Sequence, residues 1–259
     1  MVEEITAPGN RRVKDWAKLQ TSRGRKKQHR YLLEGWHLVK EALAAQVVIN
    51  ELIIVADEIS LLDDLSVPGD CEVVTITREI AQKISSTPSP QGVFAVAPLV
   101  DQQPVTPSQT QGAWLFLDGV QDPGNIGTMV RTADAAGFNG VVFGPGTADY
   151  HQPKIMRSMQ GSQFHLHLVT TPDLGEWVTT FRDRKIPVFG SELNVNARDY
   201  RTVGQHQDFA LVMGNEGNGM SADLLHQTAL NLYIPIAGQA ESLNVAVAAG
   251  ILMFQLIGG

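Results

Sequence analysis

The sequence predicts an α/β protein with two domains, because short apolar runs alternate with helical periods along most of the chain. A stretch rich in proline and glutamine, without hydrophobic periodicity, interrupts this alternation at 98–112. The 259 residues are enough for two domains, each with its own core. We therefore expect a smaller α/β domain at 1–97, a linker at 98–112 and a larger α/β domain at 113–259.

Apolar runs and helical periods alternate through the smaller domain. The expected strands are 31–34, 51–56, 71–76 and 92–98, and the expected helices are 35–45, 57–65 and 77–85.

In the larger domain the strands are almost continuously apolar, as in a parallel sheet that is covered on both faces. The expected strands are 113–120, 140–144, 164–170, 187–193, 208–214 and 232–236, and the expected helices are 125–137, 153–160, 173–184, 221–227 and 242–257. The last helix is apolar around most of its circumference, so it should pack against its own sheet and against a second subunit.

The composition excludes several classes of protein. The chain is 43% hydrophobic and 18% charged, which is typical of a globular fold. A single cysteine, Cys71, excludes a disulfide scaffold and a multi-cysteine metal site. The first residues lack the apolar core of a secretory signal, and no apolar run approaches the roughly 18 residues of a membrane span. We expect a cytoplasmic protein without membrane association.

The charge is distributed unevenly. The net charge is −7, but residues 11–40 carry +8, which leaves −15 for the rest of the chain. This asymmetry indicates either a polyanionic partner or a solvated basic helix, and charge alone does not separate the two interpretations.

Three loops at the carboxyl ends of expected strands are rich in glycine and polar residues, and this edge is where α/β sheets bind ligands. In the first loop, Asn125 is expected to cap a helix with the apolar stripe Ile126, Met129, Val130 and Ala133. Arg131 lies on another face of that helix, among small residues that leave room for a ligand. The alternative interpretation is that Arg131 is an ordinary surface arginine beside small helix-forming residues.

The second loop contains Gly214, Gly217 and Gly219 around Glu216, and it is neither a dinucleotide fingerprint nor a P-loop. It is either a tight turn or a close approach to a ligand. In the third loop, Ser242 is expected to cap the last helix, and Asn244 falls in its first turn. A buried asparagine there needs partners, either structural groups or a ligand.

Taken in order, the three loops resemble the signature motifs of the SpoU (TrmH) family of RNA 2′-O-ribose methyltransferases. The motif residues are Asn125, Gly127 and Arg131, then Met213, Gly214, Glu216, Gly217 and Gly219, then Ile234, Pro235, Gly238, Ser242, Leu243, Asn244 and Val245. The stretch RKKQHRYLLEGWHLVKEAL also resembles the small RNA-substrate-binding domain that many members carry.

The resemblance implies a SPOUT-type parallel sheet with a deep trefoil knot, a rare exception to unknotted topology. It also implies an N-terminal domain similar to a ribosomal-protein fold, and a homodimer with composite active sites. The expected cofactor is S-adenosylmethionine, held by Gly214, Ile234, Ile236, Leu243 and Ser191.

The same resemblance implies the roles of further residues. The catalytic set is Arg131, Asn125, Glu216, Ser242 and Asn244. Arg131 acts either as a general base or as a cation that positions the ribose, since an arginine normally stays protonated. The residues expected to contact RNA phosphates are Arg11, Arg12, Lys14, Arg23, Arg25, Lys26, Lys27 and Arg30.

The implied reaction is methylation of a ribose 2′-hydroxyl in RNA. No metal is expected, because the sulfonium leaving group is already activated. The chain lacks the long terminal helices of the tRNA-modifying branch, which favours ribosomal RNA. The alternatives are a tRNA methyltransferase and a catalytically silent RNA-binding or assembly factor. A nucleotide-dependent oxidoreductase is disfavoured because the dinucleotide fingerprint is missing.

Overall fold

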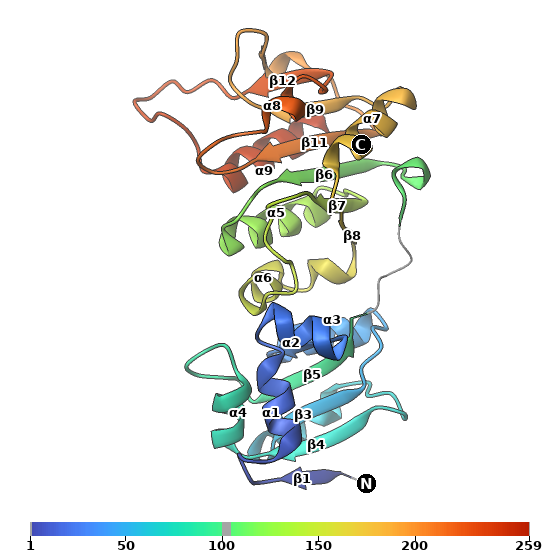
Figure 1. The fold of residues 1–259 in the computed structure, drawn as a ribbon, viewed down its shortest axis with the longest axis vertical. Coiled ribbons are helices and arrows are strands. Elements are labelled where there is room, and N and C mark those ends of the chain that lie inside the picture. Colours follow the sequence, from blue (N-terminus) through green and yellow to red (C-terminus); the bar gives the residue numbers. More distant parts are fainter. Residues whose placement is uncertain (1, 100–104, 259) are drawn as a thin grey trace. The chain divides into compact units, whose positions relative to one another are not determined.

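The computed structural model describes residues 2–99 and 105–258, which fall into two compact units (Figure 1). Unit 1 consists of Met1–Asp101 and Asp149–Phe164, and unit 2 of Gln102–Ala148 and His165–Gly259. Both units are α/β, as predicted. Residues 149–164 belong to unit 1, although their place in the sequence suggested the larger domain. Of the expected linker at 98–112, residues 100–104 lie outside the described part of the chain.

Unit 1 is built on a mixed sheet of five strands in the order β1-β4-β3-β5-β2. β1, β4 and β3 run parallel, and β5 is antiparallel to both β3 and β2. The strands are β1 (Glu3–Ile5), β2 (Arg30–Glu34), β3 (Glu51–Val55), β4 (Glu72–Ile76) and β5 (Val93–Pro98). The helices are α1 (Arg11–Lys18), α2 (Ser22–Gln28), α3 (Trp36–Ala44), α4 (Arg78–Ile84) and α6 (Pro153–Met159), with 3₁₀ helices η1 (Ala56–Asp64) and η3 (Ser162–Phe164).

Helices α1 and α4 close the main core of unit 1 against the sheet. Val13 and Trp16 of α1 are buried together with Ile80 and Ile84 of α4 and the inward side chains of the strands. The Trp16 indole donates a hydrogen bond from Nε1 to Glu51 Oε2 at 2.9 Å. α1, at the start of the basic segment 11–40, thus has one buried face and one charged face in solvent.

Residues 149–164 are held to unit 1 by a buried guanidinium. Arg25 is only 2% exposed, and its Nη2 lies 2.6 Å from Asp149 Oδ2. Its Nη1 donates to the carbonyl oxygens of Leu19 at 3.1 Å and Gln20 at 3.3 Å. Burial raises the pKa of Asp149, but hydrogen bonds from His151 and Arg25 outweigh burial and bring that pKa well below its usual value.

A second ion pair fastens the other end of this segment. Arg157 Nη1 of α6 lies 3.3 Å from Glu34 Oε2 at the end of β2. Glu34 is buried, and its carboxylate also accepts hydrogen bonds from Ser85 Oγ, from Ser86 N at 3.0 Å and from Thr87 Oγ1 at 3.1 Å. The carboxylate is therefore satisfied on both oxygens, as a buried charge requires.

Unit 2 is built on a parallel sheet of seven strands in the order β10-β12-β9-β11-β6-β7-β8. The strands are β6 (Ala113–Asp118), β7 (Gly140–Phe143), β8 (His167–Thr170), β9 (Val188–Ser191), β10 (Arg198–Asp199), β11 (Phe209–Gly214) and β12 (Leu230–Tyr233). The helices are α5 (Pro123–Ala135), α7 (Leu174–Asp183), α8 (Ala222–Leu225) and α9 (Val245–Leu256), with 3₁₀ helices η2 (Pro107–Gln109) and η4 (Tyr200–Thr202).

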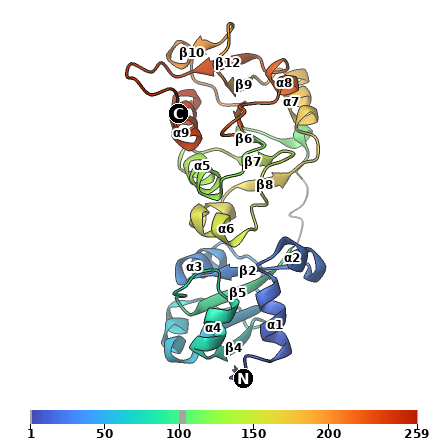
Figure 2. The same ribbon diagram turned by 60° about the vertical axis from the view of Figure 1, so that its left-hand side comes forward.

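Helices cover both faces of this sheet, as the apolar strands predict. α5 and α9 lie side by side on one face, and α7 and α8 lie on the other (Figures 1 and 2). The predicted stripe of α5, from Ile126 to Ala133, is completely buried. On the other face, Trp177 and Phe181 of α7 pack against Trp114 and Phe116 of β6. The knot expected from the resemblance stays a prediction.

Several predicted elements differ from the structure. The segment expected as a helix at 57–65 is the 3₁₀ helix η1, in which no side chain is buried, so no packing holds it in an α-helical form. The strand expected at 164–170 begins only at His167, and the one expected at 232–236 ends at Tyr233. The last helix begins at Val245 instead of residue 242.

The end of the expected linker is packed on unit 2. Residues 107–109 form η2, which has a capping box between Thr106 and Gln109. Arg184 at the end of α7 donates to the carbonyl oxygens of Pro107 at 2.8 Å and Thr110 at 2.6 Å. Within the described residues, no helix is long and apolar enough to cross a membrane.

Removal of the buried guanidinium should destabilise unit 1. We expect Arg25→Met to lower the free energy of unfolding by about 3 kcal/mol, because Asp149 loses its buried cation. The stabilisation is present above the unfolded pKa of Asp149 and is lost as the pH falls through its lower folded pKa, so the effect of the substitution should shrink in acid. Urea unfolding at pH 7 and at pH 3 measures both effects, and hydrogen exchange assigns the loss to unit 1.

The matched control is Arg23→Met, since Arg23 is an exposed arginine of the same helix. It should change the free energy of unfolding by no more than about 0.5 kcal/mol. Equal effects of the two substitutions at pH 7 would contradict the role given to Arg25.

Candidate active site

The three loops singled out in the sequence emerge at one edge of the unit 2 sheet. β6 and β11 pair in parallel with Asp118 opposite Gly214, so both strands end at the same level. β12 reaches the same edge through β9, which pairs with β11. Because all these strands are parallel, the loops that follow them converge.

Glu216 joins the loop after β11 to the start of α5. Its Oε1 accepts hydrogen bonds from Asp122 N at 3.1 Å and Asn125 Nδ2 at 3.2 Å, and its Oε2 accepts one from Gln121 N at 3.3 Å. Burial raises the pKa of Glu216, but a hydrogen bond with its own backbone, together with those from Asn125, Asp122 and Gln121, outweighs burial and holds the pKa below its usual value. Glu216 is therefore an ionised acceptor that connects two loops.

Asn244 connects the third loop to the same group. Its Nδ2 donates to Asn125 Oδ1 at 2.9 Å, and its Oδ1 accepts from Ala246 N at 2.9 Å and Val247 N at 3.3 Å. Asn244 is thus the N-cap of α9, and it is exposed. The expectations of a buried Asn244 and of a Ser242 cap are wrong, because the helix starts three residues later than expected.

The N-cap of α5 also differs from the prediction. Asp122 is the cap, and its side chain accepts a hydrogen bond from Asn125 N at 2.9 Å. Pro123 follows at the first helical position, where its missing N–H costs nothing. The side chain of Asn125, relieved of capping, is free to bridge Glu216 and Asn244.

Two glycines let the loop after β11 fold back on itself. A Cβ on Gly214 would lie 2.3 Å from the backbone of Gly219 and Met220. Gly219 has φ +67°, and a Cβ there would lie 2.4 Å from Glu192 Oε2. A side chain at either position would displace backbone or a carboxylate at this edge.

A cavity of about 950 Å³ opens where these loops meet. Every residue predicted to bind the cofactor lines it, and so do four of the five predicted catalytic residues. The predicted residues that line it are Ser191, Gly214, Ile234, Ile236 and Leu243, with Asn125, Glu216, Ser242 and Asn244. The hydroxyl of Ser242 makes no hydrogen bond to any described residue.

Sequence reasoning missed other residues at this cavity, most notably Glu192 and Asn215. Glu192 Oε2 accepts a hydrogen bond from Met220 N at 3.3 Å, and Asn215 Nδ2 donates to Gly119 O at 2.8 Å. Both directly follow strands, β9 and β11. Because α/β sheets bind ligands at the carboxyl ends of their strands, the position of both residues directly after a strand is a sequence signal that identifies them.

The lining fits S-adenosylmethionine. Apolar side chains from two loops face the cavity, and Ile236 and Leu243 remain 39% and 37% exposed. Carboxylates line it as well, whereas no lysine or arginine of the described residues does. An apolar wall beside carboxylates suits a ligand with a flat aromatic group and a positive charge.

Arg131 stands apart from the other predicted catalytic residues. It is exposed on α5, does not line the cavity, and has no hydrogen-bond or ion-pair partner among the described residues. Its neighbours Thr128 and Ala135 are exposed too. The guanidinium is therefore available to a group that approaches α5 from outside.

Three of the predicted RNA contacts are engaged within unit 1. Arg25 is buried and paired with Asp149. Arg12 forms ion pairs with Glu3, Glu51 and Glu72 at 2.7 to 2.8 Å. Arg30 Nη1 lies 2.8 Å from Glu51 Oε1. The expected contacts of these three residues with RNA stay predictions, and their guanidinium groups are largely occupied by partners within unit 1.

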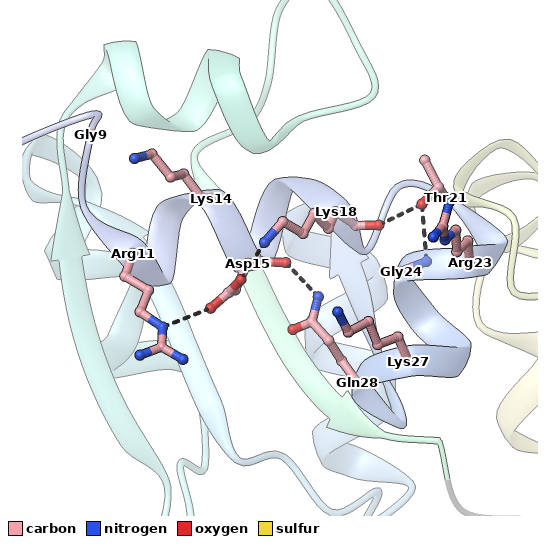
Figure 3. Close-up of a pocket in the computed structure, with 10 residues that line it drawn as sticks. All are labelled: Gly9, Arg11, Lys14, Asp15, Lys18, Thr21, Arg23, Gly24, Lys27 and Gln28. Carbon is pink, nitrogen blue, oxygen red and sulfur yellow. Dashed lines mark hydrogen bonds and ion pairs between the residues drawn. The ribbon is translucent and has the colours of Figure 1, made fainter.

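The remaining cations surround a groove of about 600 Å³ between α1 and α2, which we call the α1–α2 groove (Figure 3). Its lining residues are Gly9, Arg11, Lys14, Asp15, Lys18, Thr21, Arg23, Gly24, Lys27 and Gln28. Arg11 and Lys18 contact Asp15, whereas Figure 3 shows no such partner for Lys14 and Lys27. Lys26 is exposed on α2 outside this lining. The groove therefore carries an excess of positive charge.

Within residues 2–99 and 105–258, no group of three or more His, Cys, Asp or Glu side chains is arranged to hold a metal ion.

Comparison with known proteins gives matches to both halves of the chain. Residues 112–254 match the model of the SpoU rRNA Methylase family, and residues 10–95 match that of the MRM3-like substrate binding domain. The 23S rRNA (guanosine(2553)-2′-O)-methyltransferase RlmP of Bacillus subtilis is 42% identical over 257 residues, which is 99% of this chain and 100% of the relative.

Solved structures agree over the same length. The AdoMet-bound rRNA methyltransferase from Sinorhizobium meliloti superposes with a TM-score of 0.84 at 29% identity, covering 98% of this chain and 97% of that one. The SpoU methyltransferase AviRb from Streptomyces viridochromogenes, in complex with AdoMet, gives 0.81 at 27% identity, covering 95% and 96%. With residues of all three motifs at one cavity, the chain belongs to the SpoU rRNA methylase family.

Proposed function

We propose that this protein transfers a methyl group from S-adenosylmethionine to a ribose 2′-hydroxyl of ribosomal RNA. The observation that carries the proposal is the cavity of unit 2, where three loops bring Asn125, Glu216 and Asn244 together. A relative named as a 23S rRNA 2′-O-methyltransferase, 42% identical over the whole chain, supports the substrate class. Because ribosomal RNA is the substrate, the cytoplasm is the place of action.

When bound, S-adenosylmethionine supplies a methyl group on a positively charged sulfur. The loops after β11 and β12 hold it, with Gly214 allowing close approach of the backbone and Ile234, Ile236 and Leu243 covering its apolar part. Ser191 lines the same cavity from the end of β9. The carboxylate of Glu192, next to it, adds negative potential beside a cationic ligand.

The residues that join the three loops act by positioning. Glu216 and Asn244 spend most of their hydrogen-bonding groups on backbone amides and on Asn125. They therefore fix where the cofactor loops lie relative to α5. The hydroxyl of Ser242 is the one predicted catalytic group at the cavity that has no partner among the described residues, so it is available to the ribose or the cofactor.

Arg131 is proposed to hold the phosphate beside the target ribose. Its guanidinium is exposed and unpaired among the described residues, and it presents a planar pair of donors that suits a phosphate. Because Arg131 does not line the cavity of its own chain, a composite site in a homodimer accounts for its role. In that arrangement Arg131 of one subunit serves the cavity of the other.

The exposed face of α9 supports a homodimer. Val247 and Phe254 are 52% and 57% exposed on a helix that contains no charged side chain. Exposed apolar groups of this size on one helix indicate a surface that a partner covers. A second copy of this chain is the partner that a composite active site requires.

RNA is proposed to bind the α1–α2 groove through cations that unit 1 leaves unpaired. Lys14, Arg23 and Lys27 line the groove, Arg11 and Lys18 contribute beside Asp15, and Lys26 lies outside the lining. Each phosphate that a cation neutralises releases counterions, which makes the affinity depend on salt.

The experiment that tests the function is transfer of labelled methyl from S-adenosylmethionine to deproteinised ribosomal RNA and, separately, to tRNA. We expect label in a 2′-O-methylnucleoside of the ribosomal RNA. Label only in tRNA would show that the substrate is tRNA and not ribosomal RNA. No label in either RNA or in ribosomal precursor particles, with the cofactor bound, would establish a silent RNA-binding factor and overturn the proposal.

Loss of the exposed guanidinium should abolish turnover without unfolding the protein. We expect Arg131→Ala to lower kcat at least about 100-fold, because the ribose is no longer aligned by its phosphate. The affinity for S-adenosylmethionine, measured by calorimetry, should stay unchanged. Arg182→Ala, another exposed arginine, is the control and should keep its activity. Full activity of Arg131→Ala would remove this residue from the mechanism.

The apolar wall of the cavity should contribute to cofactor affinity. We expect Leu243→Ala to weaken binding of S-adenosylmethionine about tenfold, since it removes apolar surface that the ligand covers. Val195→Ala, at a residue 99% exposed and outside the cavity lining, should leave the affinity unchanged. Isothermal titration calorimetry measures both. Equal affinities of the two variants would place the cofactor elsewhere.

A charge on the exposed face of α9 should dissociate the dimer. We expect Phe254→Glu to be monomeric in analytical ultracentrifugation at micromolar concentration, because an unpaired carboxylate would be buried in the interface. Val48→Glu, at an apolar residue 63% exposed in unit 1, should stay dimeric. A dimer of Phe254→Glu with unchanged affinity would place the interface on another surface.

A further inference from the structure

A second polar pocket lies in unit 1, on the side of α2 that faces α6. It has a volume of about 400 Å³ and joins three segments of the chain. We call it the α2–α6 pocket, and its lining residues are Gln20, Ser22, Arg25, Ser86, Gln152, Pro153, Lys154 and Arg157. We propose that this pocket binds one nucleotide of the RNA substrate, away from the methylated ribose, an inference that rests on the proposed function.

The lining is suited to an anionic ligand with hydrogen-bonding groups. Two glutamines and two serines provide amide and hydroxyl groups, and none of the described carboxylates lines the pocket. Lys154 is exposed and has no partner among the described residues. Its ammonium group can contact a phosphate, and the amides of Gln20 and Gln152 can hydrogen-bond a ribose or a base edge.

The two arginines of the lining form a rigid frame for the pocket. Arg25 is buried and bonded to Asp149 and to two backbone carbonyl oxygens, so it forms the floor. Arg157 is held by Glu34 and donates to Ser86 Oγ. Because both guanidinium groups are fixed, the positions of Lys154 and Gln152 at the start of α6 are fixed as well.

The pocket and the α1–α2 groove share helix α2. Thr21, Arg23 and Lys27 line the groove, whereas Ser22 and Arg25 of the same segment line the pocket. At about 100° per residue, Arg23 and Lys27 lie on one side of α2, and Ser22 and Arg25 lie on the other. A strand of RNA held in the groove can therefore place a further nucleotide in the pocket by crossing α2, a helix of 7 residues.

The chemistry favours RNA over a free small molecule or a protein. Pro153 is the one apolar residue of the lining, and none of the described aromatic side chains lines the pocket. A free nucleotide gains most of its affinity from stacking or enclosure, which this pocket does not offer. A nucleotide within an RNA strand needs little local affinity, because the groove already holds its neighbours.

The test is Lys154→Glu in the full chain, assayed for methyl transfer to ribosomal RNA at several salt concentrations. We expect the KM for RNA to rise about tenfold with kcat unchanged, because a phosphate contact is replaced by repulsion. The slope of log affinity for RNA against log salt concentration should fall by the contribution of about one phosphate contact. Lys40→Glu, at an exposed lysine of α3, should match the wild type.

Each outcome decides between the proposals. A KM and a salt dependence equal to those of the wild type would overturn the proposal that the α2–α6 pocket binds RNA. The proposed function would stand in that case, because the wild type is active. A defect seen only with ribosomal particles and absent with naked RNA would assign the pocket to a protein partner. An inactive wild type on every RNA would instead overturn the proposed function.

A second measurement locates the RNA directly. Cys71 is buried, and burial raises the pKa of its thiol, so a cysteine introduced at residue 154 is the reactive one. We expect a hydroxyl-radical probe on Lys154→Cys to cleave bound ribosomal RNA in one short stretch, and the same probe on Lys40→Cys to give no such stretch. Identical cleavage patterns from the two positions would contradict RNA in the pocket.

Discussion

One carboxylate, that of Glu216, connects the loops at the edge of the unit 2 sheet where β6, β11 and β12 end. It accepts hydrogen bonds from the amides of Gln121 and Asp122 and from the side chain of Asn125, which in turn accepts one from Asn244. Three loops thus share one polar network, in which Asn244 bonds to Asn125, 119 residues earlier in the sequence. Asn215, which donates to Gly119 O, and Asp118, which accepts from Ser221 N, add further links between the loops after β6 and β11.

The sequence predicted this edge well because its rule is topological. Ligand groups of a parallel sheet gather at the carboxyl ends of strands, so Asn125, Glu216 and Asn244 could be placed together without knowledge of any contact. The N-cap residues of α5 and α9 are harder to predict from the sequence. Asp122 and Asn125 are equally good caps by type, and only Pro123 at the first helical position decides for Asp122. Ser242 and Asn244 compete in the same way, and the structure assigns the cap to Asn244.

The basic segment shows where local reasoning fails. Arg12 and Arg30 find carboxylates on β3 and β4, and Arg25 finds Asp149, more than a hundred residues away. Such partners depend on tertiary structure, so charge density alone could not separate structural cations from solvent-facing ones. For the same reason, sequence order places 149–164 in the larger domain, whereas the ion pairs of this segment tie it to unit 1.

That return of residues 149–164 to unit 1 governs the order in which the chain can fold during synthesis. Arg25 and Glu34 are made early, but the residues that neutralise them, Asp149 and Arg157, leave the ribosome more than a hundred residues later. Multidomain chains usually complete their first domain before the next one is translated. Here unit 1 stays incomplete until the first strands of unit 2 have emerged. Nascent unit 1 therefore lacks the ion-pair partners of Arg25 and Glu34 for much of its translation.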